Sequence, residues 1–124
     1  MGLAAVTVTL DKIQRLHKEW LLSGTVAIAA SPDTYATGGL VMDFATMTLP
    51  PGHSLPVNSV PKRVRIFSNK TGTTSAYVYE YAPGTTISNG KIKAVAGALA
   101  EHSAAAVAAA VSGDTIAWEA FFDA

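Results

Sequence analysis

The sequence predicts an all-β fold: an antiparallel, jelly-roll-like β-sandwich of about eight short strands with one long proline-rich loop. Two alternating apolar runs between residues 64 and 95 flank Pro83-Gly84 and Asn89-Gly90, the strongest turn signals in the chain. Similar short runs bounded by turn residues recur on both sides of this stretch. Because the chain has 124 residues and no cysteine, we expect one domain, residues 1–124, that packing alone stabilises.

Four short strands are expected in the first 45 residues. Val6, Val8 and Leu10 alternate with threonines, which suits a half-buried first strand. Residues 12–22 fit either a helical stripe or a strand face, and we favour the strand. The third and fourth strands are expected at residues 26–30 and 40–44, because Ser23-Gly24 and Gly38-Gly39 introduce them as turn signals.

Three later runs show the clearest alternation. Val64, Ile66 and Ser68 share one face of a predicted strand. Residues 77–81 place three tyrosines on one face of the next. Residues 116–122 follow a Ser-Gly-Asp turn and carry apolar side chains on both faces, so this last strand is expected to lie centrally in a sheet.

A long loop or arm is predicted at residues 47–61. Its prolines lack backbone N–H groups, and Gly52, Asn58 and Ser59 favour turns, so neither a helix nor a strand fits. Loops of this length inside a compact domain often reach a partner. The loop therefore either contacts a neighbouring subunit or only connects two strands, and the sequence leaves both open.

Residues 94–111 are mostly alanine, which favours a helix by intrinsic propensity. An alanine helix, however, has almost no apolar stripe to bury, whereas small side chains suit strands or bends where two sheets come close. We favour extended structure with a bend near residues 101–103. A helix of two or three turns is the alternative.

The charge of the chain is low and balanced: charged residues make up 15% and the formal net charge is zero. A fully solvated surface of this kind has little electrostatic protection against self-association, so other protein is expected to cover part of it. The nine lysines and arginines are too few for binding to nucleic acid or an anionic membrane. No signal peptide or transmembrane segment is expected, and the chain is expected to be soluble.

The sequence shows no pattern that predicts catalysis, a metal site or a cofactor. His17, His53 and His102 lie far apart and lack the spacing of metal ligands. Glu80 and Glu119 lie on predicted strands, where glycosidase carboxylates are conceivable, but solvent-facing positions are the more economical interpretation. We therefore expect a protein that is not an enzyme.

Several segments together resemble small virion proteins of tailed bacteriophages, over residues 6–122. The segments that carry the resemblance are residues 35–39, 77–79, 83–86, 89–93, 113–116 and 118–122. The resemblance implies a capsid cement or decoration protein, made in the host cytoplasm and located on the capsid surface of the virion. It also implies a β-sandwich, commonly trimeric, whose partner is the major capsid protein, and it brings no catalytic residues.

The candidate contacts with the capsid or with neighbouring subunits lie in the loop, a basic group, the tyrosine row and the last strand. They are Pro50, Pro51, His53, Pro56, Lys62, Arg63, Arg65, Tyr77, Tyr79, Tyr81 and Phe121. The basic group, Lys62, Arg63 and Arg65, either binds an acidic patch on a partner or protects an edge strand from pairing with another chain.

The tyrosine row suits the core or a subunit interface better than stacking against sugar rings. A carbohydrate-binding module and a tail or neck component remain the alternative functions.

Overall fold

The computed structural model describes residues 2–30, 33–68, 77–96 and 101–123. These residues form seven strands and one short helix, which confirms the all-β class. The elements are β1 (Val6–Arg15), β2 (Glu19–Ile28), β3 (Leu40–Val41), β4 (Arg63–Ser68), β5 (Tyr77–Ala82), β6 (Lys91–Ala96), α1 (Ala109–Ser112) and β7 (Ile116–Asp123). No helix within the described ranges is long and apolar enough to cross a membrane.

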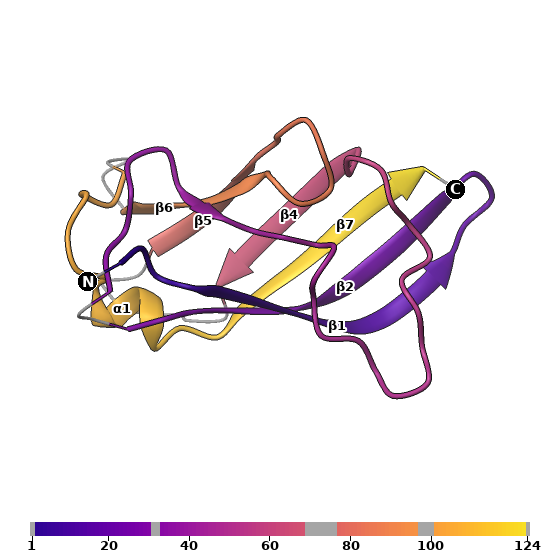
Figure 1. Cartoon of the computed structure of the whole chain (residues 1–124), viewed down its shortest axis with the longest axis horizontal. Helices are drawn as coiled ribbons and strands as arrows, with labels where there is room; N and C mark the ends of the chain where they lie inside the picture. Colours follow the sequence, from indigo (N-terminus) through magenta and orange to yellow (C-terminus); the bar gives the residue numbers. More distant parts are fainter. Residues whose placement is uncertain (1, 31–32, 69–76, 97–100, 124) are drawn as a thin grey trace.

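The strands form two antiparallel sheets (Figure 1). The larger sheet has the order β1-β2-β7-β4 and the smaller one the order β3-β6-β5. Strands β4 and β5 contact each other where the two sheets meet. Strand β7 pairs with β2 on one side and with β4 on the other, so the predicted central position of residues 116–122 is confirmed.

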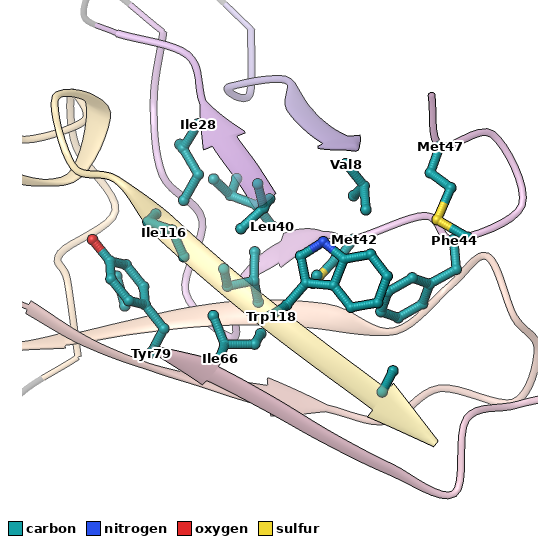
Figure 2. Packing of buried hydrophobic residues seen from close by; sticks show 14 of the residues in the cluster. Val8, Ile28, Leu40, Met42, Phe44, Met47, Ile66, Tyr79, Ile116 and Trp118 are labelled. Atoms are coloured by element: carbon teal, nitrogen blue, oxygen red, sulfur yellow. The ribbon is translucent and has the colours of Figure 1, made fainter. Parts of the chain in front are cut away.

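Inward-facing side chains of both sheets fill one hydrophobic core. Every second residue of β7 is buried, from Ile116 through Trp118 and Ala120 to Phe122. Figure 2 shows the indole of Trp118 beside the ring of Phe44, and the two ring centroids lie 5.0 Å apart in an edge-on arrangement. Offset and edge-on ring pairs of this kind add to the gain from burial.

The prediction that Ser23-Gly24 is a turn is wrong, because both residues lie inside β2. The chain reverses earlier, at residues 16–18, so residues 12–22 form a hairpin end and not one strand. Opposite Gly24, the register of β1 shifts between Leu10 and Lys12, where Asp11 forms a β-bulge. The glycine is required because the backbone of Thr9 approaches it closely, and not because the chain turns.

The predicted fourth strand at residues 40–44 is shorter than expected. Only Leu40 and Val41 pair as β3, with β6. Met42 and Phe44 are buried as the alternation predicts, but their N–H groups donate to the carbonyls of Gly90 (2.9 Å) and Ile87 (3.3 Å) in a loop. The first 45 residues therefore contribute three strands, where four were expected.

The alanine-rich segment is extended where it is described, apart from one helical turn. Strand β6 includes the residues up to Ala96, and residues 97–100 lie outside the described part. Isolated bridges then join Glu101 to Val95 and Ala106 to Thr34. The only helix described is α1, with four residues, which is shorter than the alternative of two or three turns.

Candidate interaction surface

The outer face of the four-stranded sheet carries the side chains of β1, β2, β7 and β4 that point away from the core. The pairing register aligns its outward side chains in rows that run across the sheet. From β1 to β4, the rows are Thr9, Thr25, Ala117, Phe67; then Lys12, Ser23, Glu119, Arg65; then Gln14, Leu21, Phe121, Arg63. The first row is therefore uncharged, with small side chains beside Phe67, and the second is mostly charged. The third is mixed.

Phe67 is the most distinctive residue of this face. It is 42% exposed and lies on β4, at the edge of the four-stranded sheet. It lines an open depression of about 390 Å³ together with the small side chains of Ala117 and Thr25 and, from β1, Asp11 and Lys12. Aromatic residues are enriched at the centre of protein–protein interfaces relative to the rest of the surface.

The sequence contained a signal for Phe67, because it shares one face of β4 with the exposed Arg63 and Arg65, whereas Ile66 on the opposite face is buried. It was nevertheless missing from the predicted contacts.

Lys62 and Arg63 pair with carboxylates of the same chain. The Lys62 ammonium lies 2.9 Å from Glu19 and 3.4 Å from Asp123, and Arg63 lies 3.1 Å from Glu19. Hydrogen bonding from Lys62, supported by Arg63, lowers the pKa of the Glu19 carboxyl. The bond to Glu19 in turn raises the pKa of Lys62.

The other arginine of the basic group is also paired. Arg65 lies 3.1 Å from Glu119 of β7, its cross-strand neighbour, and the Arg63 guanidinium lies 4.4 Å above the ring of Phe121. All three cations thus have partners within the chain. This arrangement favours protection of the edge strand β4 from pairing with another chain over binding to an acidic patch.

The three tyrosines of β5 face inward. Tyr79 is buried, Tyr77 and Tyr81 are half-buried, and the intervening residues are exposed. The Tyr79 hydroxyl donates to Asp114 at 2.8 Å, and burial followed by this bond raises the pKa of Tyr79. Core packing is therefore the interpretation that fits the tyrosine row, and the ring of Tyr79 is covered within this chain.

The proline-rich loop is anchored at its ends and exposed at its tip. Met47 and Val57 are buried in the core, whereas residues 51–54 are exposed. The Pro50 carbonyl accepts the His53 N–H at 3.1 Å, and Gly52 has a φ of 81°, which makes residues 50–53 a tight Pro-Gly turn. Figure 1 shows the loop as the magenta segment that projects beyond β1.

Thr48, near the start of this loop, covers part of the free edge of β1. It accepts the Leu10 N–H at 2.8 Å and donates to the Val8 carbonyl at 2.9 Å. The predicted contact residues are therefore spread over three places: the loop beside β1, the basic residues at the start of β4 with Phe121 of the neighbouring β7, and the core side of β5. The structure does not bring them together in one site.

A polar network at the other end of the molecule was not predicted from the sequence. The buried Tyr35 hydroxyl donates to Glu101 at 2.7 Å and accepts the Ala94 N–H at 3.2 Å, while the Gly38 N–H donates to the same carboxylate oxygen at 2.7 Å. Burial raises the pKa of Tyr35, and its hydrogen bond lowers the pKa of Glu101. The stabilisation from Glu101 is thus present above the ordinary pKa of a glutamate and is lost as the pH falls through the lowered value.

Tyr35→Phe is expected to lower the free energy of unfolding by about 1–3 kcal/mol, because the Ala94 N–H loses its partner in a buried position. Urea unfolding followed by circular dichroism measures the change. Tyr81→Phe is the matched control, since the Tyr81 hydroxyl is buried and has no hydrogen-bond partner among the described residues. Equal losses in both variants would contradict the role of the network.

The candidate glutamates Glu80 and Glu119 each have a basic partner within the chain. Glu119 is paired with Arg65, and Glu80 lies 3.7 Å from Lys93 on the other sheet, so the two glutamates do not face each other. Within the described ranges, no group of three or more histidine, aspartate or glutamate side chains has the geometry to hold a metal ion.

Comparison with known proteins found no similar protein. No protein-family model, no curated protein and no solved structure matches the chain. The functional argument therefore depends on the residues of this chain, their arrangement and the resemblance described above.

Proposed function

We propose that this protein is a structural component of a bacteriophage virion. It binds the outer surface of the capsid as a homotrimer and stabilises the shell by bridging major capsid subunits. Support comes from the resemblance to small virion proteins, the net charge of zero and the exposed Phe67 on an otherwise small-residue row. Of these, the exposed Phe67 is the observation that carries the choice of surface.

The outer face of the four-stranded sheet is the proposed capsid-binding surface. Small side chains in the row of Phe67 allow close approach by a partner, and the neighbouring Arg65–Glu119 pair adds little net charge to the contact. Burial of this face across a seam between capsid subunits adds its binding free energy to their association. In a trimer, three such faces act together, so weak single contacts become strong.

The proposed architecture is a jelly-roll-like sandwich. Along the chain, β2, β3, β4 and β5 belong alternately to the larger and the smaller sheet. Strand β6 then stays in the smaller sheet beside β5, and β7 returns to the larger one between β2 and β4. This crossing between two sheets is the connectivity that a jelly roll requires. It supports the proposed likeness to virion proteins at the level of topology.

Phe67→Asp is expected to weaken capsid binding at least tenfold, because it places a charge where an aromatic anchor is buried. The measurement is co-sedimentation of the purified protein with phage heads prepared without it, together with the temperature at which the heads release DNA. Val78→Asp is the matched control, since Val78 is 59% exposed on the other sheet and is expected to leave binding unchanged.

The two failures of this experiment have different meanings. If wild-type protein neither binds the heads nor raises their rupture temperature, the proposed function is wrong. If wild type binds and Phe67→Asp binds equally well, the proposed surface is wrong. Light scattering after size-exclusion chromatography tests the trimer, which has three times the 12.8 kDa chain mass.

The carbohydrate-binding alternative has less support than the proposal, because the tyrosine row that suggested it faces the core. A tail or neck position differs from a capsid position only in the particle fraction that contains the protein. Labelling of intact particles with an antibody separates these two locations.

A further inference from the structure

His102 is a buried histidine whose two ring nitrogens both have backbone partners. Its side chain is in the core region at 6% exposure. Nδ1 lies 2.7 Å from the Ser103 carbonyl, which only accepts, so Nδ1 carries the hydrogen. Nε2 accepts the Ala108 N–H at 3.1 Å and therefore carries none. The fold thus selects one neutral tautomer of this imidazole.

Residues 101–108, which we name the strap, connect two parts of the fold. On one side, the backbone N–H of His102 donates to the Ala94 carbonyl of β6 at 2.8 Å. On the other side, the Tyr35 N–H donates to Ala105 at 2.9 Å, and the Val107 N–H donates to Asp33 at 3.0 Å. Figure 1 shows the strap in orange beside the N-terminus. The bond between Ala108 and the imidazole closes the strap on itself.

We propose that His102 is a pH-sensitive latch: protonation of its imidazole releases the strap from β6 and from residues 33–35. A second ring hydrogen at Nε2 would point at the Ala108 N–H, so two donors would face each other in a buried place. Histidine is the side chain that ordinarily changes charge between about pH 5 and 8. The latch acts on the fold itself and does not depend on the proposed capsid role.

The aromatic, charged and titratable groups around the imidazole are Tyr35, Tyr77, Glu101 and, beyond Glu101, Lys93 of β6. The rings of Tyr35 and Tyr77 lie 4.7 Å and 5.6 Å from the imidazole, and the Glu101 carboxylate is adjacent in the chain. Tyr35, Tyr77 and Glu101 favour a cation, but Glu101 already accepts two hydrogen bonds and also interacts electrostatically with Lys93. None of them replaces the acceptor that Ala108 loses.

The sign of the effect follows from proton binding. The closed strap holds the imidazole neutral, whereas the open strap lets it take up a proton. The open form therefore binds more protons, and the closed form loses stability as the pH falls. One proton taken up on opening increases the open population by up to tenfold for each pH unit.

Hydrogen exchange at single amides, measured by NMR on the full chain between pH 7.5 and 5, tests the latch. We expect the protection factors of the Tyr35, Val107 and Ala108 amides to fall by about tenfold per pH unit at the acidic end. The amides between β2 and β7 are expected to keep their protection, because the hydrogen bonds of the strap named above go to β6 and to residues 33–35. A uniform loss across the molecule, or none at the strap, would overturn the proposal.

His102→Gln is the decisive variant, because its side-chain oxygen is able to accept the Ala108 N–H and does not titrate. Its strap amides are expected to show no acid-dependent loss, whereas His17→Gln and His53→Gln, at exposed positions, retain the wild-type behaviour. If His102→Gln does not fold, the ¹⁵N shifts of the wild-type imidazole decide. The Nδ1–H tautomer at neutral pH is expected, and the Nε2–H tautomer would refute the latch.

Discussion

Trp118→Ala is expected to lower the free energy of unfolding by about 3–5 kcal/mol, the range for truncating a large aromatic residue in a packed core. Trp118 is 1% exposed at the centre of β7 and packs edge-on against Phe44 at 5.0 Å. Its indole Nε1–H also donates to the Thr25 carbonyl at 3.0 Å, so truncation removes a hydrogen bond as well as the contacts of the ring. Since domains are typically stable by about 5–15 kcal/mol, this loss is a large fraction of the total.

Urea unfolding monitored by far-ultraviolet circular dichroism measures this change without relying on tryptophan fluorescence. Trp118→Phe is the matched control, because phenylalanine keeps an aromatic ring beside Phe44 and loses the bond to Thr25 and only part of the packed volume of the indole. We expect the phenylalanine variant to lie between wild type and the alanine variant. A change below about 0.5 kcal/mol for Trp118→Ala, the usual range for a surface substitution, would show that the ring is not part of the core.

Local alternation predicted the strands that show the clearest period-two pattern. Apolar side chains on both faces of residues 116–122 predicted a central strand, and the strands paired with β7 on both sides confirm that place. The alternation also put the three tyrosines of β5 on one face, and Val64 with Ile66 on one face of β4, and in the structure both of these faces point inward. Period-two patterning is a property of the strand itself, and it is therefore visible in one sequence.

The errors arose where a local signal has two structural meanings. A glycine marks either a turn or the close approach of another backbone, and at Gly24 the second meaning applies. Met42 and Phe44 are buried in alternation beyond β3, so the sequence pattern there looks like a strand. Their backbone N–H groups, however, donate to carbonyls of a loop and not to a paired strand. Only the tertiary arrangement distinguishes these cases.

The candidate surface was predicted less well than the fold. The basic residues after the loop are paired with Glu19, Asp123 and Glu119, which come from β2 and β7. The alternation on β4 marks Phe67 as outward-facing, but its small neighbours Ala117 and Thr25 follow only from the register of the strands. Such relations join residues far apart in the chain, so composition and spacing do not reveal them.

Gly24→Ala is expected to destabilise the protein by about 3 kcal/mol, at the upper end of the range for overpacking. A Cβ added at Gly24 would overlap the carbonyl oxygen of Thr9 and lie 3.1 Å from the backbone nitrogen of Asp11. Both are main-chain atoms of β1, so no side-chain rotation relieves the overlap. Strand β1 has to move away from β2 at the bulge, which weakens the pairing between Leu10 and Gly24.

Thermal and urea unfolding measure the loss, and hydrogen exchange of the β1 amides shows where it occurs. Gly2→Ala is the matched control, because an added Cβ there meets no atom within 4 Å and its effect is expected to be close to zero. If Gly24 were a turn residue, its replacement would disturb mainly the local chain reversal and leave the β1–β2 register intact. Unchanged protection of the amides around the bulge, with wild-type stability, would therefore contradict the close approach of Thr9 as the reason for the glycine.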